Sequence, residues 1–229
     1  MRGLYRHLSQ LCYCQGGGLA MVLKKDPLNV IITGVGGQGN VLASQLLGNA
    51  LVDKDFFVTI GETYGASQRG GSVMSHVRVS KKAQCSPLIP EGQADVILGL
   101  EPLEALRVMG NYGNPNILIV VNSRPIYPLD VTVGNAKYPT MQTFHSVLTE
   151  LSREAYMLDA TDLAVTLGPP ILANIIMVGS LVGLEAIPLT KEDIEKTISN
   201  TFPANKLEIN LKALQMGIDT VMTSGRVQP

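Results

Sequence analysis

The sequence contains no tryptophan and only three cysteines, Cys12, Cys14 and Cys85, among its 229 residues. Three thiols cannot supply a disulfide framework, a four-ligand zinc site or an iron–sulfur cluster from this chain alone. The pair Cys12 and Cys14 leaves one alternative open, half of a metal site shared with another chain. We otherwise predict no metal site, and a cysteine-poor chain of this kind is typical of a reduced, cytoplasmic protein.

An excess of charge of either sign is also missing. Eighteen basic residues stand against 19 acidic ones, and only 5% of the residues are aromatic. A nucleic-acid-binding surface needs basic side chains for the phosphates and, for single strands, aromatic rings for the bases. The composition therefore excludes nucleic acid as the expected partner.

Long apolar runs are absent as well. No stretch of 18 or more apolar residues marks a membrane-spanning helix. The N-terminal stretch "LSQLCYCQGGGLAMVL" is interrupted by glutamines and glycines, so it lacks the continuous apolar core of a signal peptide. We expect residues 1–27 to be a flexible extension, or a segment that a shorter product starting at Met21 would lack, and residues 28–229 to be one domain.

Strand and helix patterns alternate through the first two thirds of this domain. "LNVIIT" (28–33) is a short apolar strand, and "NVLASQLLGNALV" (40–52) follows at helical spacing. Val96–Leu100 and the helix Leu103–Met109 repeat that order, and residues 116–122 form another fully apolar strand. Repeated βα units predict an α/β fold, Rossmann-like, with a mostly parallel sheet and helices on both faces.

The pattern becomes purely helical from about residue 169 to 229. The apolar helix over 171–187 has more apolar surface than one core face needs, so it is either central to the core or packed against another subunit. Thr190 is placed to cap the next helix, because acidic residues follow in its first turn. A long amphipathic helix ends the chain.

A glycine cluster follows the first strand directly. Gly34, Gly36 and Gly39 satisfy the spacing G-x-G-x-x-G, with Gly37 and Gln38 between them. Backbone N–H groups in such a turn, together with the N-terminus of the next helix, form a phosphate cradle. Glu62 stands where a dinucleotide-binding site has its ribose-binding acid. The alternative is a tight turn that only packs strand against helix.

A second glycine-rich loop, "TYGASQRGGS", lies about thirty residues further on. Ser67, Gln68 and Arg69 precede Gly70 and Gly71, and Ser72 follows. Hydroxyls, an amide and one planar cation suit a phosphate or carboxylate, so we predict one anion site shared by both loops. For Arg69, a salt bridge between domains is the alternative.

Motifs of self-sufficient catalysts are absent. The sequence has no G-x-S-x-G elbow, no H-E-x-x-H helix and no G-x-x-x-x-G-K-[ST] loop. His76 has no serine, cysteine or second histidine near it in the sequence, and we interpret it as a structural strand residue. We therefore predict no catalytic residue in this chain.

The motifs "GVGGQGNVLAS" (34–44) and "ETYGASQRGGSVMSHVRVS" (62–80), in this order, resemble the gamma-type domain of the 2-oxoacid:ferredoxin oxidoreductases, in particular the indolepyruvate type. The resemblance implies decarboxylation of a 2-oxoacid on thiamine diphosphate, electron transfer through iron–sulfur clusters to ferredoxin, and release of an acyl-coenzyme A. No G-D-G-type thiamine motif and no cysteine cluster occur here, so thiamine diphosphate, Mg and the iron–sulfur clusters are expected on a larger partner subunit.

The resemblance also implies roles for the two loops. Gly34, Gly36, Gly37, Gln38 and Gly39 would line the phosphates of coenzyme A, and Ser67, Gln68, Arg69 and Gly70 would close the other side. Gln68 and Arg69 replace a lysine-rich pair of the pyruvate-type relatives, so Arg69 either binds a phosphate or reaches toward the partner. The alternatives are a stand-alone Rossmann-type oxidoreductase and a purely structural assembly subunit.

Overall fold

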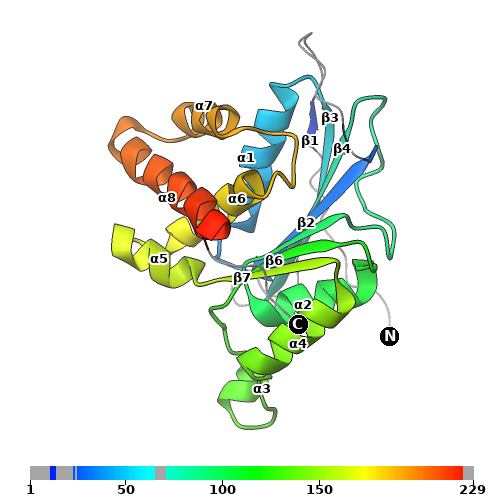
Figure 1. Cartoon of the computed structure of the whole chain (residues 1–229), viewed down its shortest axis with the longest axis vertical. Coiled ribbons are helices and arrows are strands. Elements are labelled where there is room, and N and C mark those ends of the chain that lie inside the picture. The colour runs from blue at the N-terminus through cyan, green and yellow to red at the C-terminus, as the bar shows by residue number, and fades with distance from the viewer. Residues whose placement is uncertain (1–10, 14–22, 24, 65–70, 224–229) are drawn as a thin grey trace.

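The structure, a computed structural model, describes residues 11–13, 23, 25–64 and 71–223. Within them the chain forms one seven-stranded sheet in the order β1-β3-β4-β2-β5-β6-β7 (Figure 1). The strands are β1 (Leu11–Tyr13), β2 (Leu28–Val35), β3 (Phe57–Tyr64), β4 (Ser72–Ser80), β5 (Val96–Gly99), β6 (Leu118–Asn122) and β7 (Glu154–Leu158).

Helices cover both faces of this sheet (Figure 1). The α-helices are α1 (Asn40–Val52), α2 (Pro102–Tyr112), α3 (Leu129–Thr132), α4 (Met141–Leu151), α5 (Ala160–Leu167), α6 (Ala173–Gly183), α7 (Lys191–Thr201) and α8 (Ala204–Thr223). A short 3₁₀ turn, η1 (Pro170–Leu172), leads directly into α6. The predicted α/β fold with a helical C-terminal part is confirmed.

The sheet is mixed rather than uniformly parallel. β2, β5, β6 and β7 run parallel, whereas β4 pairs antiparallel with both β2 and β3. The connection from β3 to β4 explains this, because residues 65–71 are too few for a crossover, which takes a dozen or more residues. The parallel strands therefore form one block, and an antiparallel ribbon extends it.

Strand β1 lies at the edge of the sheet, beside β3. Leu11 pairs with Ile60 and Tyr13 with Val58, so residues 11–13 form an antiparallel pair with β3. An edge strand such as β3 presents unpaired N–H and C=O groups, and β1 satisfies them on that side. No pattern in the sequence of residues 11–13 predicts this pairing.

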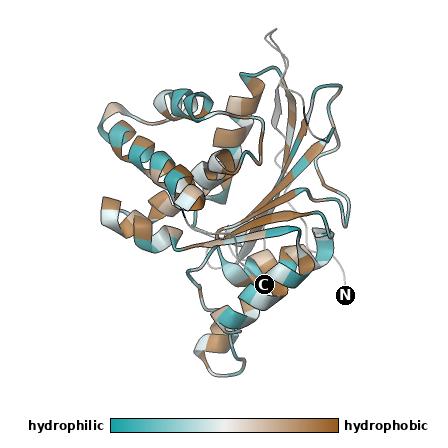
Figure 2. Ribbon diagram, viewed as in Figure 1, coloured by the Kyte–Doolittle hydropathy of each residue, from teal (hydrophilic) through white to brown (hydrophobic). Residues whose placement is uncertain are grey.

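Alternate residues of β2 face two separate cores. Val30 and Ile32 join a large apolar cluster under α1, α6, α7 and α8, and Ile31 joins a smaller one under α2 and α4. Strands buried on both faces read as continuous apolar runs, which is the pattern of residues 28–33. Figure 2 shows this apolar character along the strands.

Helix α6 lies at the centre of the larger core. Every residue from Asn174 to Val182 is buried within this chain. Its closest neighbour is α8, which crosses it at Gly179 and Gly217. Of the two alternatives for the apolar segment 171–187, the structure therefore supports the core, and an apolar helix left for another subunit is wrong.

Two other helices test local sequence signals. Thr190 caps α7 as predicted, in a reciprocal pair with Asp193: Thr190 N–H donates to Asp193 Oδ2 at 2.9 Å, and Asp193 N–H donates to Thr190 Oγ1 at 3.4 Å. Helix α4, capped by Thr140, was not predicted, because only Phe144 and Leu148 on it are buried. Among the described helices, none has the length and apolarity needed to cross a membrane.

Candidate functional site

The glycine cluster lies at a crevice that the topology creates. Helix α1 follows β2 on one face of the sheet, and α2 follows the neighbouring parallel strand β5 on the other face. Where the direction of the connections reverses in this way, ligands bind at the carboxyl ends of the strands. The turn over residues 34–39 stands at that point.

The end of the second glycine-rich loop, Gly71, lies beside the glycine turn. Gly36 N–H donates to the carbonyl oxygen of Gly71 at 2.8 Å, and Val35 pairs with Ser72 across β2 and β4. This contact brings the end of the second loop beside the first, as the shared site requires. Ser67, Gln68, Arg69 and Gly70 themselves lie outside the described residues.

Backbone conformation explains two of the glycines. Gly37 has φ of +107° and Gly39 has φ of +87°, in the region that other residues rarely adopt. Gly37 is exposed, and a β-carbon there would meet nothing within 4 Å. Gly39 precedes α1 and has no side chain to cap it, so the N–H groups of the first turn of α1 have no side-chain acceptor at this position.

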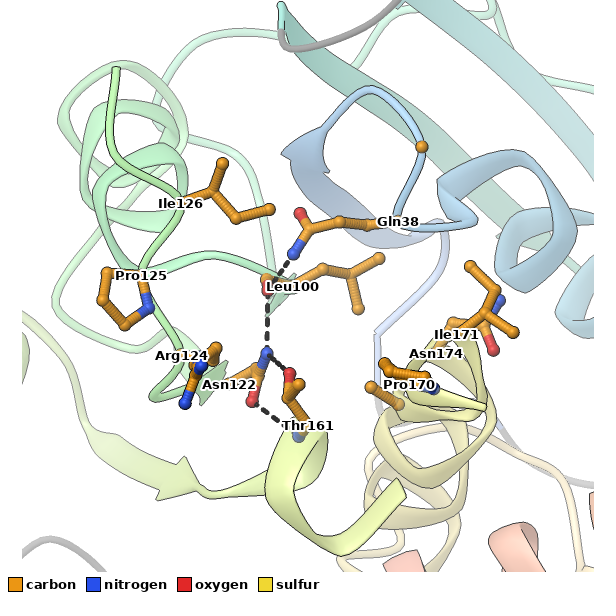
Figure 3. Close-up of a pocket in the computed structure, with 12 residues that line it drawn as sticks. Gln38, Leu100, Asn122, Arg124, Pro125, Ile126, Thr161, Pro170, Ile171 and Asn174 are labelled. Atoms are coloured by element: carbon orange, nitrogen blue, oxygen red, sulfur yellow. Dashed lines mark hydrogen bonds between the residues drawn. The ribbon is translucent and has the colours of Figure 1, made fainter. Parts of the chain in front are cut away.

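The side chain of Gln38 makes two hydrogen bonds within the protein. Its Oε1 accepts a hydrogen bond from Val35 N–H at 2.7 Å, and its Nε2 donates to the carbonyl oxygen of Leu100 at 2.8 Å. Both ends of the amide are therefore engaged within the protein. Gln38 ties the turn after β2 to the end of β5, and it also contributes to the wall of a pocket (Figure 3).

The pocket has a volume of about 310 Å³ and opens at the carboxyl ends of β2, β5 and β6. Pro125 and Ile126 lie on one side of it, and Pro170, Ile171 and Asn174 lie on the other (Figure 3). The lining is completed by Gly37, Gln38, Leu100, Asn122, Arg124, Thr161 and Ala173. Its walls are thus largely apolar, with a few polar groups at defined positions.

A hydrogen-bonded network forms one end of this pocket. Asn122 Nδ2 donates to Leu100 O at 3.1 Å and to Thr161 Oγ1 at 2.9 Å, and Asn122 Oδ1 accepts from Thr161 N–H at 3.2 Å. Leu100 O therefore holds both Gln38 and Asn122 (Figure 3). The network joins the ends of β5 and β6 to the first turn of α5.

Arg124 is the charged residue of the pocket lining. Its guanidinium is largely exposed and lies 3.4 Å from Asp162 Oδ1, itself exposed. An exposed pair of this kind contributes little stability, so Arg124 is available for an anion. Sequence reasoning missed Asn122 and Arg124, although their place directly after an apolar strand is a usable signal.

A buried carboxylate holds the segment that borders the pocket. Glu101 accepts hydrogen bonds from Glu104 N–H at 2.8 Å, from Ile126 N–H at 3.3 Å and from the hydroxyl of Tyr138. Burial, and next the hydrogen bond to Glu101, raise the pKa of Tyr138 well above its usual range, so its phenol stays neutral. Glu101 thereby anchors residues 125–138 to the end of β5.

Comparison with known proteins identifies the family. Residues 29–220 match the model described as Pyruvate ferredoxin/flavodoxin oxidoreductase. The chain belongs to the pyruvate ferredoxin/flavodoxin oxidoreductase family. It is 39% identical over 199 residues to the indolepyruvate oxidoreductase subunit IorB of Archaeoglobus fulgidus, covering 87% of this chain and 97% of that subunit. The chain is thus the small subunit of a 2-oxoacid:ferredoxin oxidoreductase.

Solved structures agree on the fold of this family member. The gamma subunit of a keto/oxoacid ferredoxin oxidoreductase from Geobacter sulfurreducens superposes with a TM-score of 0.63 at 23% identity, covering 86% of this chain and 99% of that one. The 2-oxoglutarate:ferredoxin oxidoreductase of Magnetococcus marinus, solved with 2-oxoglutarate, coenzyme A and succinyl-CoA, gives 0.67 at 20% identity, covering 86% of this chain and 32% of that one.

Glu62 does not take the position of a ribose-binding acid in this member of the pyruvate ferredoxin/flavodoxin oxidoreductase family. It is buried in β3 opposite Ser75 of β4, and β4 separates β3 from β2. Two strand spacings, about 10 Å, therefore lie between Glu62 and the glycine turn. In a dinucleotide site the acid ends the neighbouring parallel strand, so the stand-alone Rossmann alternative loses its support here.

His76 is buried in β4, away from the pocket. Its Nδ1 accepts a hydrogen bond from Ile89 N–H at 3.3 Å, and its ring meets Tyr112 edge-on at 5.3 Å between centroids. These contacts lie on the α2 face of the sheet and support the structural interpretation. Over the part of the chain that the structure describes, no three His, Cys, Asp or Glu side chains gather as a metal site.

Proposed function

We propose that this chain is the coenzyme A-binding, non-thiamine subunit of an indolepyruvate-type 2-oxoacid:ferredoxin oxidoreductase. It binds the phosphates of coenzyme A at the turn over residues 34–39 and at the loop that ends at Gly71. Decarboxylation takes place on the larger partner subunit, which carries thiamine diphosphate, Mg and the iron–sulfur clusters. The partner passes electrons to ferredoxin, and the product leaves as an acyl-coenzyme A.

The hydrogen bond from Gly36 N–H to Gly71 O carries this proposal. It joins the turn over residues 34–39 to Gly71, the end of the second loop, beside the crevice where the connections from β2 and β5 diverge. Helix α1 begins at this crevice and has no acidic residue in its first turn, so its N-terminus favours the binding of an anion. Arg124 adds a positive charge on the far side of the pocket.

The redox groups of the reaction do not fit this chain. Three cysteines are one fewer than a four-cysteine cluster needs, and of these Cys85 is a free thiol in the described residues. The choice of indolepyruvate rests on the relation to the IorB subunit of Archaeoglobus fulgidus. What this chain's own residues do is bind and orient the acyl acceptor.

Substituting Gly37 by aspartate tests the phosphate site. The complex with the larger subunit is expected to show a KM for coenzyme A raised about tenfold or more, because a carboxylate would repel the phosphates. Initial rates of dye reduction with indolepyruvate, measured over a range of coenzyme A concentrations, give this value. Gly92→Asp is the matched control.

Gly92 also has a positive φ, +68°, and a β-carbon there would meet the carbonyl oxygen of Gly113 at an ordinary contact distance of 3.9 Å, but Gly92 lies before β5, at the opposite end of the strands. The Gly92→Asp substitution should leave the KM for coenzyme A unchanged. Equal effects of both substitutions, or no effect of either, would contradict the proposed site. Binding of a dinucleotide by the isolated chain would favour a stand-alone oxidoreductase instead.

Exposed apolar side chains next to the pocket are suited to contact the partner subunit. Ile126, Tyr127, Leu129 and Val133 are exposed on the segment that Glu101 anchors, and Figure 2 shows the apolar character of α3. Ile126 also lines the pocket. The partner must reach a thiol held there, so we assign this segment to its contact surface.

Leu129→Asp is expected to weaken association with the larger subunit about tenfold or more, because an exposed apolar contact would become a desolvated charge. The dissociation constant of the two purified subunits provides the measurement. Met222→Asp is the control, since Met222 is 73% exposed on α8 and Leu129 is 75% exposed. Equal loss of affinity in both variants would show that the segment containing Leu129 is not a specific part of the interface.

A further inference from the structure

A second pocket lies at the opposite end of the sheet from the glycine turn. It has a volume of about 450 Å³, within the range of small-molecule pockets, roughly 300–1,000 Å³. The first residues of four parallel strands line it: Leu28 of β2, Val96 of β5, Leu118 of β6 and Glu154 of β7. The segment Leu184–Pro188, which follows α6, also lines it. Because the proposed coenzyme A site stands at the carboxyl ends of these strands, this pocket is a separate site.

The inner wall of this second pocket is apolar. It is formed by Leu28, Val96, Leu118 and Ile187, which are at most 9% exposed and belong to the larger apolar core. A hydrocarbon group placed against this wall gains the free energy of burial, whereas a polar group would lose its hydrogen bonds to water. A ligand that fills the pocket therefore has an apolar part.

Charged side chains of both signs border the same pocket. Lys25 Nζ lies 2.7 Å from Asp95 Oδ1, and Arg153 Nε lies 3.1 Å from Glu154 Oε1. The side chains of Lys25 and Arg153 are 50% and 56% exposed, and ion pairs that are exposed in this way contribute little stability. Their cationic groups can thus also contact a ligand carboxylate at the pocket.

Glu185 is a third carboxylate at this pocket, and it takes part in no ion pair among the described residues. Its φ is +50°, in the left-handed region, where it ends α6. Glu185 N–H donates to Val182 O and Ala186 N–H donates to Leu181 O, each at 3.0 Å. Glycine is the usual residue at this position of a helix end. The carboxylate is therefore not required by the local fold, and it is available for a cationic group.

We propose that this pocket binds a free α-amino acid with an apolar side chain. Glu185 binds the ammonium group, Lys25 and Arg153 bind the carboxylate, and the side chain lies against the apolar wall. Both signs of charge next to an apolar wall match a zwitterion of this kind, whereas an amine or a carboxylic acid would use only one of them. The site goes beyond the proposed function, because it lies at the other end of the strands from the phosphate-binding turn.

Isothermal titration calorimetry of the reconstituted complex tests the ligand class. L-Phenylalanine and L-leucine are the probes. Phenethylamine lacks the carboxylate and 3-phenylpropionate lacks the ammonium group, so each should bind about tenfold or more weakly than L-phenylalanine. Phenethylamine or 3-phenylpropionate binding as tightly as L-phenylalanine would overturn the assignment to an amino acid. No binding of either probe would overturn the site itself.

Glu185→Gly assigns the binding to this pocket. It should raise the dissociation constant of L-phenylalanine about tenfold or more, and it should melt no lower than the unsubstituted subunit, because glycine adopts a positive φ without strain. Asp55→Gly is the matched control, since Asp55 also has a positive φ, +63°, and does not line the pocket. It should leave the dissociation constant unchanged. Unchanged binding in Glu185→Gly, or equal losses in both variants, would contradict the site.

Glu185→Gly and Gly37→Asp together separate this inference from the proposed function. Gly37→Asp should leave the binding of L-phenylalanine unchanged, and Glu185→Gly should leave the KM for coenzyme A unchanged. If only Gly37→Asp fails to have its expected effect, the coenzyme A site is wrong and the amino acid site stands. If only Glu185→Gly fails, the reverse holds. Displacement of L-phenylalanine by coenzyme A would overturn the inference, because it would place both ligands in one site.

Discussion

Gly217→Ala is expected to lower the free energy of unfolding by about 3 kcal/mol, the upper end of the usual cost of overpacking a core. A β-carbon at this position would lie 2.8 Å from the carbonyl carbon of Ile176 on α6 and even closer to its oxygen. These are backbone atoms, so no side chain can rotate away. Helices α6 and α8 would have to separate.

Urea unfolding followed by circular dichroism measures this change. Gly110→Ala is the matched control, because Gly110 also lies within a helix, α2, and a β-carbon there meets nothing within 4 Å. It should raise the free energy of unfolding by about 0.5–1 kcal/mol through helix propensity. A Gly217→Ala subunit as stable as the unsubstituted one would show that the crossing of α6 and α8 is not close-packed.

Glu101→Ala is expected to lower the free energy of unfolding by about 2 kcal/mol or more, because it leaves buried donors without their acceptor and removes the cap of α2. Glu101 is 1% exposed and accepts from Glu104 N–H, Ile126 N–H and the Tyr138 hydroxyl. The loss should also release residues 125–138, which faster hydrogen exchange over that segment would report.

Tyr138→Phe removes only one of these contacts and is expected to cost less. Because the folded state raises the pKa of Tyr138, the neutral phenol contributes its full stability below about pH 10, the usual pKa of tyrosine. Above that pH the unfolded chain releases the proton first, so stability falls. The variant should lose this alkaline decrease, and an unchanged decrease in Tyr138→Phe would assign it to another group.

Much of the fold and part of the site followed from local patterns. The apolar runs at 28–33, 96–100 and 116–122 became β2, β5 and β6, and Thr190 caps α7 as its sequence predicted. The glycine turn lies between β2 and α1, as the order of strand, turn and helix patterns in the sequence predicted. These features depend on neighbours within a few residues, where periodicity and capping chemistry act.

Other features depend on partners far apart in the chain. The sequence alone determined an α/β domain, its βα order and a glycine turn opening α1, because those follow from local backbone preferences. Only the tertiary structure decided that β4 runs antiparallel beside β2 and that α6 lies in the core. It also decided that the side-chain amide of Gln38 hydrogen-bonds to the backbone of Val35 and Leu100. It alone also brought Asn174 to Gly39 across 135 positions, because such contacts arise from packing between elements.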